Sequence, residues 1–268
     1  MHQIPRDHPR YESLRIRQRV VSGAERGLAV SEGLLAHGRG EAFDYLLGER
    51  TNPEARAATR AAAAALLLAK RPVLSCNGNV ASLVPDDLVR LAAAIPGAAV
   101  EVNLFHRTEE RAQRIGLELE TAAGKMGGRG NGPRIFSGRP DARLAGLSSD
   151  RAKCHREGMF LADVVLVPLE DGDRAEALKR AQKTVIAIDL NPLSRTARAA
   201  DMTIVDNIVR ALPALLRQVQ LLRGSPSSRL SRIVEGFDNG ANLRKAIGRI
   251  LRRLAVLSRE RRPAAASE

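Results

Sequence analysis

The segment T-V-I-A-I-D-L-N-P-L-S-R-T-A-R-A-A-D-M-T-I-V-D-N-I, residues 184–208, decides the fold of this chain. It begins with an apolar run at 185–188 and then switches to polar side chains, and a second apolar run at 202–205 ends in the same way. Short, bounded runs of this kind are typical of strands that are buried on both faces of a parallel sheet. Ligands of open α/β sheets bind beyond the carboxyl ends of the strands, so we expect one crevice here that holds a nucleotide. The polar residues assigned to this crevice are Asp189, Asn191, Arg195, Asp206 and Asn207.

The rest of the chain alternates predicted strands with predicted helices. Strands that alternate with helices are the signature of a doubly wound α/β sheet. Predicted helices also precede the first strand, at 13–29 and 53–69, and two more follow the sheet from about residue 225. We therefore expect residues 1–268 to form a single α/β domain with helical additions at both ends. The other predicted strands lie at 72–76, 98–103 and 164–168.

A glycine-rich segment at 124–158 interrupts this alternation. A loop of this length inside a compact domain is usually functional or unstructured, so we interpret the segment as an insertion or a flap. It is not a Walker A loop, because Gly124 and Lys125 are followed by Met126 where that motif requires serine or threonine.

Composition excludes several classes of protein. Hydrophobic residues make up 44% of the chain, which is enough for a core, and no apolar run reaches the length of a signal peptide or a membrane span. The formal net charge of +13 would suit a nucleic-acid-binding protein, but the basic residues are scattered and aromatic residues for base stacking are few. Cys76 and Cys154 form neither a metal motif nor a disulfide framework. We expect a soluble, cytoplasmic protein that binds neither nucleic acid nor a membrane.

Other residues could contact an anion or a cation. Two glycines flank Arg39; glycine lets the backbone approach a ligand and arginine binds phosphate bidentately, although the same tripeptide occurs in ordinary turns. Asn207 is a good N-cap, so the helix that follows it offers N–H groups to an anion. Asp171 and Asp173 could bind Mg²⁺, but Asp173 with Glu176 equally fits a helix capping box, and both interpretations stay open.

Six segments carry a resemblance to a known family. In order and in spacing they resemble archaeal-type phosphopantothenate synthetase, also called 4-phosphopantoate–β-alanine ligase, and the similarity extends from Ile4 to about Asn242. The segments are H-G-R-G-E-A-F-D-Y-L (37–46), N-G-N-V-A (77–81), E-V-N-L-F-H-R-T-E-E-R (101–111), V-P-L-E-D-G-D-R-A-E-A-L (167–178), I-D-L-N-P-L-S-R-T-A-R (188–198) and D-M-T-I-V-D-N-I-V-R-A (201–211).

The resemblance implies an ATP-dependent ligase with a Rossmann-like core that acts as a homodimer. Such an enzyme joins 4-phosphopantoate to β-alanine through an acyl-adenylate and yields 4′-phosphopantothenate, AMP and diphosphate for coenzyme A biosynthesis. Mg²⁺ is expected on the ATP phosphates. The ATP contacts implied by the resemblance are Arg17, Arg39, Asp189, Leu190, Asn191, Arg195, Thr196, Asn207 and Ile208.

The acid substrate and the amine need residues of their own. Arg107 and Lys153 are candidates to hold the phosphate of phosphopantoate, and Asn79 and Asn103 could bind its hydroxyl or carboxylate oxygens. His37 could take the proton from the ammonium group of β-alanine, or it could equally be a turn histidine bonded to the backbone.

Two other functions remain as alternatives. A kinase acting on pantoate or a related acid would yield ADP instead of AMP. A non-enzymatic nucleotide-binding module would keep the crevice and lack the second cluster of Asn103, Arg107 and Lys153.

Overall fold

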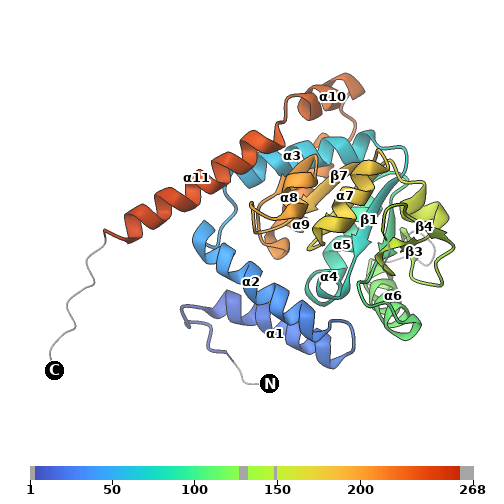
Figure 1. Ribbon diagram of the computed structural model, residues 1–268, viewed down its shortest axis with the longest axis horizontal. Coiled ribbons are helices and arrows are strands. Elements are labelled where there is room, and N and C mark those ends of the chain that lie inside the picture. Colours follow the sequence, from blue (N-terminus) through green and yellow to red (C-terminus); the bar gives the residue numbers. More distant parts are fainter. Residues whose placement is uncertain (1–3, 127–131, 148–149, 260–268) are drawn as a thin grey trace.

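A parallel sheet forms the core of the molecule (Figure 1). The computed structural model describes residues 4–126, 132–147 and 150–259. The sheet has six strands, and every neighbouring pair is parallel, which confirms the predicted α/β class. In order across the sheet, the strands are β3 (Arg134–Phe136), β2 (Ala99–Val102), β1 (Pro72–Cys76), β6 (Val164–Pro168), β7 (Thr184–Ile188) and β8 (Met202–Ile204).

The chain changes direction across the sheet between β1 and β6. It runs outward from β1 through β2 to β3, then returns to pair β6 with β1 and continues through β7 to β8. This is the strand order of a Rossmann-like doubly wound sheet, whose ligands bind beyond the carboxyl ends of the strands at the switch point. Asn77 follows β1 and Leu169 follows β6, so these two residues mark that point.

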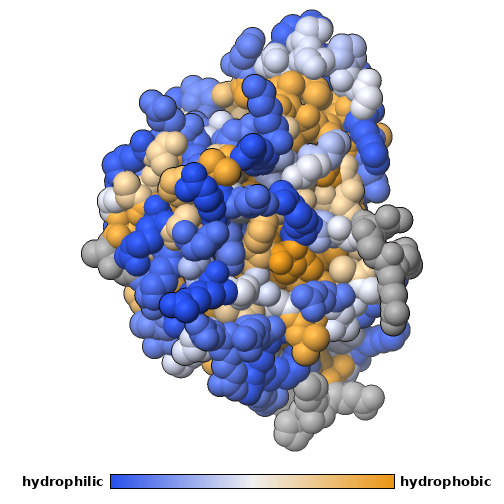
Figure 2. Space-filling model, turned by 90° about the vertical axis from the view of Figure 1, so that its right-hand side faces the viewer, coloured by the Kyte–Doolittle hydropathy of each residue, from blue (hydrophilic) through white to orange (hydrophobic). Residues whose placement is uncertain are grey.

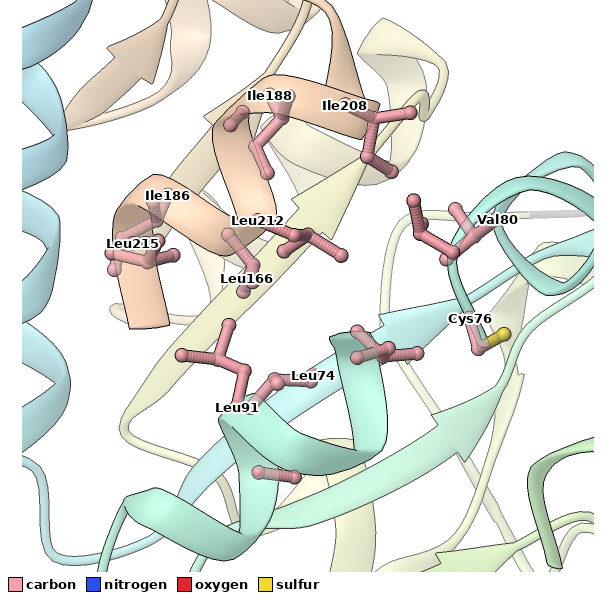
Figure 3. Packing of buried hydrophobic residues seen from close by; sticks show 14 of the residues in the cluster. Leu74, Cys76, Val80, Leu91, Leu166, Ile186, Ile188, Ile208, Leu212 and Leu215 are labelled. Carbon is pink, nitrogen blue, oxygen red and sulfur yellow. The ribbon is translucent and has the colours of Figure 1, made fainter. Parts of the chain in front are cut away.

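The central strands are buried on both faces, and their side chains alternate between two hydrophobic clusters. In β7, Ile186 and Ile188 belong to one cluster, whereas Val185 and Ala187 belong to the other. Figure 3 shows the first cluster, in which Leu212 of α9 packs over the sheet. The first cluster is covered by α3 (Pro53–Leu68), α5 (Pro85–Ala94), α6 (Glu109–Gly124) and α9 (Ile208–Leu222). The second is covered by α7 (Gly172–Arg180), β4 (Ala142–Arg143), β5 (Lys153–Cys154) and η2 (Arg156–Phe160), and a short helical turn, η1 (Asp150–Ala152), precedes β5.

Helical additions flank the sheet at both ends of the chain, as predicted. Helix α1 packs against α4 and α2, and α2 also contacts α11, whose C-terminal half extends away from the body in Figure 1. Within the described residues, no helix combines the length and the apolar character needed to cross a membrane. The N-terminal additions are α1 (Tyr11–Glu25) and α2 (Ser31–Leu47), and the C-terminal ones are α10 (Ser227–Glu235) and α11 (Asn239–Leu257). Two short helices, α4 (Gly78–Leu83) and α8 (Arg195–Ala199), follow β1 and β7.

Part of the glycine-rich segment at 124–158 differs from the prediction. Residues 134–136 form β3, an edge strand of the main sheet, and residues 142–160 include a small hairpin and a turn of π-helix, so the segment is not simply an insertion or a flap. A three-residue strand has no recognisable apolar run, which explains why the sequence did not predict it. Positions 127–131 and 148–149 of the predicted flap lie outside the described residues.

Two of the alternatives left open by the sequence are not formed. Arg39 and its flanking glycines lie within helix α2 and not in a turn. The capping box of Asp173 and Glu176 does not form, because α7 begins at Gly172 with Asp171 as its N-cap residue and Glu176 pairs with Arg195.

Candidate active site

A pocket of about 570 Å³ lies at the carboxyl ends of β6, β7 and β8, and we call it the main pocket. Helix α2 forms its opposite wall with Ala36, Phe43 and other residues, and α4 contributes Leu83. The main pocket brings together most of the predicted site residues from segments that are far apart in the sequence. Those residues are His37, Arg39, Asn79, Asp171, Asp173, Asp189, Leu190, Asn191, Arg195, Thr196, Asn207 and Ile208.

Helix starts surround the main pocket. Asn207 caps α9, since its Oδ1 accepts a hydrogen bond from the N–H of Val209 at 3.3 Å, and α7 begins at Gly172 beside it in the pocket lining. Helix N-termini carry unpaired N–H groups and a partial positive charge, so both starts favour an anion. Gly172 is required for this arrangement, because a Cβ there would lie 2.3 Å from the Cβ of Arg195 at the start of α8.

Asp189 shapes the loop that follows β7. Its Oδ1 accepts a hydrogen bond from the N–H of Asn191 at 2.9 Å, and its Oδ2 accepts one from the hydroxyl of Ser194. Burial raises the pKa of Asp189, while these hydrogen bonds and the nearby charge of Arg39 oppose that shift. Arg39 itself is exposed on α2 and has no ion-pair partner among the described residues, so its guanidinium is available to a ligand.

His37 lies on α2 between the main pocket and a smaller neighbouring one. Its Nε2 is buried and finds no hydrogen-bond partner in the described part of the chain. Burial lowers the pKa of His37, so the imidazole is neutral at neutral pH and can accept a proton. Of the two interpretations given above, the turn histidine is wrong, because residue 37 lies inside a helix.

Asn77 supports the main pocket without lining it, and it was not among the predicted site residues. It caps α4 through Oδ1, and its Nδ2 donates hydrogen bonds to the carbonyls of Pro168 and Leu169 at 3.2 and 2.9 Å. Leu169 lines the main pocket with φ of 51°, a left-handed conformation that is rare for leucine. Asn77 therefore holds a strained turn at the switch point, and its position directly after a predicted strand was the signal that could have identified it.

Two of the predicted ATP-binding arginines form ion pairs with glutamates. Arg17 lies on α1, outside the main pocket lining, and its Nη2 binds Glu41 Oε2 at 2.8 Å. Arg195 lines the pocket, and its Nη2 binds Glu176 Oε2 at 2.8 Å.

Arg107 and Lys153 lie in a different pocket, of about 500 Å³, which we call the basic pocket. Arg139 and Arg143 also line it, together with the acidic residues Glu109 and Asp141. Arg107 donates hydrogen bonds to the carbonyls of Val102, Ser137 and Gly138, and Lys153 pairs with Asp150 at 2.7 Å. The side of the molecule that carries β3, β4 and α6 is covered mainly by hydrophilic residues (Figure 2).

Asn103 lines neither of these two pockets. It is buried at the end of β2, and its Oδ1 accepts a hydrogen bond from Nη1 of Arg174 at 2.6 Å. Arg174 is itself buried, and its Nε lies 3.4 Å from Glu170, a residue of the main pocket. Asn103 is thus joined to the main pocket through Arg174 and Glu170.

Neither cysteine is suited to covalent catalysis. Cys76 and Cys154 are both free and buried. Burial raises the pKa of Cys154 to about 12 and that of Cys76 further, so both thiols are protonated at neutral pH.

Metal-binding residues were predicted at Asp171 and Asp173, and both line the main pocket beside the start of α7. Among the described residues, no group of three or more His, Cys, Asp or Glu side chains is placed to hold a metal ion. One or two carboxylates together with substrate phosphates are a usual arrangement for Mg²⁺, so the two aspartates fit that ion.

Comparisons with known proteins agree on one family. Residues 54–253 match the sequence model described as phosphopantothenate/pantothenate synthetase. The 4-phosphopantoate–β-alanine ligase of Thermococcus onnurineus (strain NA1) is 49% identical over 96% of this chain and 96% of its own length. The proteins of that name from Thermococcus kodakarensis and Methanosarcina mazei are 49% and 48% identical, over 96% and 97% of this chain and 95% and 99% of their own lengths.

Proposed function

The chain belongs to the phosphopantothenate/pantothenate synthetase family, and from this premise we propose that it is an ATP-dependent 4-phosphopantoate–β-alanine ligase. The products are 4′-phosphopantothenate, AMP and diphosphate, and the reaction serves coenzyme A biosynthesis. Besides the relatives, one observation carries the proposal: the main pocket combines Arg39 with the starts of α7 and α9 at the strand ends.

The chemistry requires activation of a carboxylate. A carboxylate does not react with an amine at neutral pH, because its oxygen is a poor leaving group. In the proposed first step, the carboxylate oxygen of phosphopantoate attacks the α-phosphorus of ATP and diphosphate leaves. In the second step, the amine of β-alanine attacks the acyl carbon and AMP leaves.

The main pocket supplies what the first step demands. Negative charge accumulates around phosphorus in the transition state, and fixed cations and N–H donors stabilise it best when they are already in place. Arg39 provides charge from α2, and the starts of α7 and α9 provide N–H groups from the opposite wall. Arg195 and Arg17 add charge once each exchanges its glutamate partner for phosphate.

The nucleoside fits the apolar part of the same pocket. Phe43, Leu190 and Ile208 give a hydrophobic surface for adenine. Asp189 accepts hydrogen bonds from the ribose hydroxyls, by analogy with acidic residues that follow strands in other Rossmann-like sheets. Asn191 and Thr196 line the pocket beside it and complete the proposed contacts.

Mg²⁺ is the proposed metal. Asp171 and Asp173 would hold it against the phosphates, and when bound it neutralises part of their charge.

The phosphate of the acid substrate is proposed to bind in the basic pocket through Arg107 and Lys153. The support is the concentration of cationic side chains there, since arginine matches the geometry of a phosphate group. Asn79 is proposed to bind the hydroxyl or carboxylate oxygens directly, and Asn103 is proposed to contribute through Arg174 and Glu170. Asn79 lines the main pocket, and its Nδ2 donates a hydrogen bond to the carbonyl of Gly33 at 2.8 Å.

His37 is the proposed base for β-alanine. Its neutral imidazole and unpartnered Nε2 can take the proton that the ammonium group must lose before it attacks.

We also infer a homodimer that works in the cytoplasm. The extended half of α11 exposes apolar side chains, which is typical of surfaces that bind another protein. The two free, buried thiols suit a reducing compartment. The exposed residues of α11 are Leu251, Leu254, Val256 and Leu257.

Incubation with ATP, 4-phosphopantoate and β-alanine, followed by mass spectrometry, tests the proposal. We expect 4′-phosphopantothenate and AMP in equal amounts. Under multiple-turnover conditions, neither product should accumulate when β-alanine or ATP is left out of the reaction mixture. Formation of ADP would instead support a kinase. Binding of ATP without any turnover would support a non-enzymatic nucleotide-binding module.

A further inference from the structure

A buried polar network joins helix α2 to the start of α9. Asp44 of α2 accepts hydrogen bonds from Nη1 and Nη2 of Arg210 and, at 2.8 Å, from Nδ2 of Asn207. Arg210 also donates from Nε to Asp206 Oδ1 at 2.8 Å, and Asp206 Oδ2 accepts a hydrogen bond from Thr51 at 2.6 Å. We call Asp44, Asn207 and Arg210 the α2–α9 clamp.

The clamp is partly buried, and its three residues line the smaller pocket of about 290 Å³ that His37 also reaches. The side chain of Asp44 is 7% exposed and that of Arg210 is 25% exposed. A buried carboxylate is stable only when its charge is matched and its oxygens accept hydrogen bonds, and here both conditions are met by α9. Removal of either partner would therefore cost an ion pair and leave a charged group without its main partner.

The two helices form opposite walls of the main pocket. Arg39 and Phe43 reach the pocket from α2, on the same helix as Asp44 and N-terminal to it, while Asn207 reaches it from the loop after β8. Asp44 does not line the main pocket. Asp44 therefore links, from outside the main pocket, the helix that carries Arg39 to the start of α9.

Asp44 also fixes which way the amide of Asn207 points. A carboxylate only accepts hydrogen bonds, so the NH₂ group of Asn207 must face Asp44. Its Oδ1 is then turned towards the N–H of Val209, where it caps α9. The free N–H groups at the start of α9 keep their direction only while this cap is in place.

We propose that Asp44, with Arg210, is a positioning residue for the nucleotide. The clamp holds Arg39 and the start of α9 at the separation that the triphosphate needs, and Asp44 and Arg210 act from outside the main pocket. This inference rests on the proposed function only in taking ATP as the ligand of the main pocket.

A second buried ion pair, away from the main pocket, serves as a control. It allows an effect on nucleotide binding to be distinguished from an effect on protein stability. Glu54 of α3 binds Arg249 of α11 through two hydrogen bonds of 2.9 and 3.0 Å, and the two side chains are 9% and 26% exposed. The pair thus resembles Asp44 and Arg210 in burial and in its two-pronged contact, whereas Arg210 alone also binds Asp206, and neither Glu54 nor Arg249 lines the main pocket.

The experiment compares Asp44→Asn with Glu54→Gln. For each variant we would measure the melting temperature, the Kd of ATP by calorimetry, and the KM values for ATP and β-alanine. Both variants should lose a similar number of degrees in melting temperature. Only Asp44→Asn should weaken the binding of ATP. We expect its Kd and KM for ATP to rise about tenfold to a hundredfold, while its KM for β-alanine is unchanged.

Several outcomes decide the question. If the Kd of ATP in folded Asp44→Asn equals that of Glu54→Gln, the clamp is merely structural and the inference is wrong. Should Asp44→Asn fail to fold, Arg210→Lys takes its place, because it keeps the charge but loses the two-pronged contact. An unchanged Kd of ATP in Arg210→Lys would also show that the inference is wrong. A wild-type chain that binds ATP but makes no phosphopantothenate would overturn the proposed function. The Kd values of ATP in Asp44→Asn and Glu54→Gln would still test the role of the clamp. A wild-type chain that does not bind ATP would overturn both.

Discussion

The main pocket and the basic pocket are built in different ways. The main pocket is made by the fold itself, since strand ends and helix starts converge there and the polar residues follow β6, β7 and β8 directly. The basic pocket is made by side chains of connecting segments, with Arg107 after β2 and Arg139, Arg143 and Lys153 around a short hairpin. The comparison teaches that topology can place a nucleotide, whereas recognition of a second substrate depends on loops.

The largest effect is expected for Arg39→Ala. Loss of a fixed cation at the phosphates should lower the rate of AMP formation about 10²–10³-fold, because such groups stabilise the transition state more than the bound substrate. The fold should be intact, since Arg39 is exposed. Arg217→Ala removes another exposed arginine, from α9, and should leave the rate unchanged. Wild-type kinetics in Arg39→Ala would remove this residue from the site.

Arg107→Ala should have the next largest effect and tests whether the basic pocket serves the acid substrate. We expect the KM for phosphopantoate to rise about tenfold to a hundredfold, as for other charge-assisted contacts, while the KM for ATP changes little. Steady-state kinetics with each substrate varied in turn would show the split. Equal increases in both KM values would mean that the two pockets do not divide the substrates as proposed.

The pH dependence of the second step tests His37. Its pKa lies below the ordinary histidine value because the ring is buried, so the base is neutral, and competent, at neutral pH. As the pH falls through this lowered pKa the imidazole gains a proton, and kcat/KM for β-alanine should fall by about tenfold per pH unit. His37→Gln should lower the rate and abolish this acidic limb. An identical acidic limb in the variant would assign the titration to another group.

The smallest effect is expected for a pair of glycine substitutions. Gly172→Ala places a methyl group against Arg195 and the start of α8, and should cost about 1–3 kcal/mol of unfolding free energy and weaken ATP binding. Gly38→Ala, on α2, meets no atom within 4 Å and should stabilise the helix by about 0.5–1 kcal/mol. Chemical denaturation and ATP titration of both variants would check this. If the two variants behave alike, the close approach of α7 and α8 does not shape the pocket.

Much of the main pocket could be predicted from the sequence because its residues follow strands that are easy to recognise. A strand buried on both faces leaves a continuous apolar run, and the first polar residue after it, such as Asp189, marks the carboxyl edge of the sheet. The pattern marked Arg39 as a possible anion contact, and the resemblance assigned it to ATP, but an arginine between two glycines does not by itself reveal a helix.

What the sequence could not show depends on contacts between distant segments. Strand β3 is too short to leave a pattern, and the bond between Asp44 and Arg210 joins residues on two helices whose packing no periodicity reveals. The same is true of Arg174, which is buried with Asn103 although arginine is usually exposed. The sequence also could not predict that Arg107 and Lys153 lie in a different pocket from the ATP contacts, because the order of residues does not show which pocket a loop reaches.

The pairing of β1 with β6 also affects how the chain is made. Pro72 pairs with Val164, so the middle of the sheet joins two parts of the chain that leave the ribosome far apart in time. Until β6 emerges, one apolar edge of β1 has no neighbour, and an unpaired strand edge readily joins another chain. Newly synthesised molecules therefore pass through a stage at which aggregation competes with folding, and that stage ends only when the second half of the sheet has been translated.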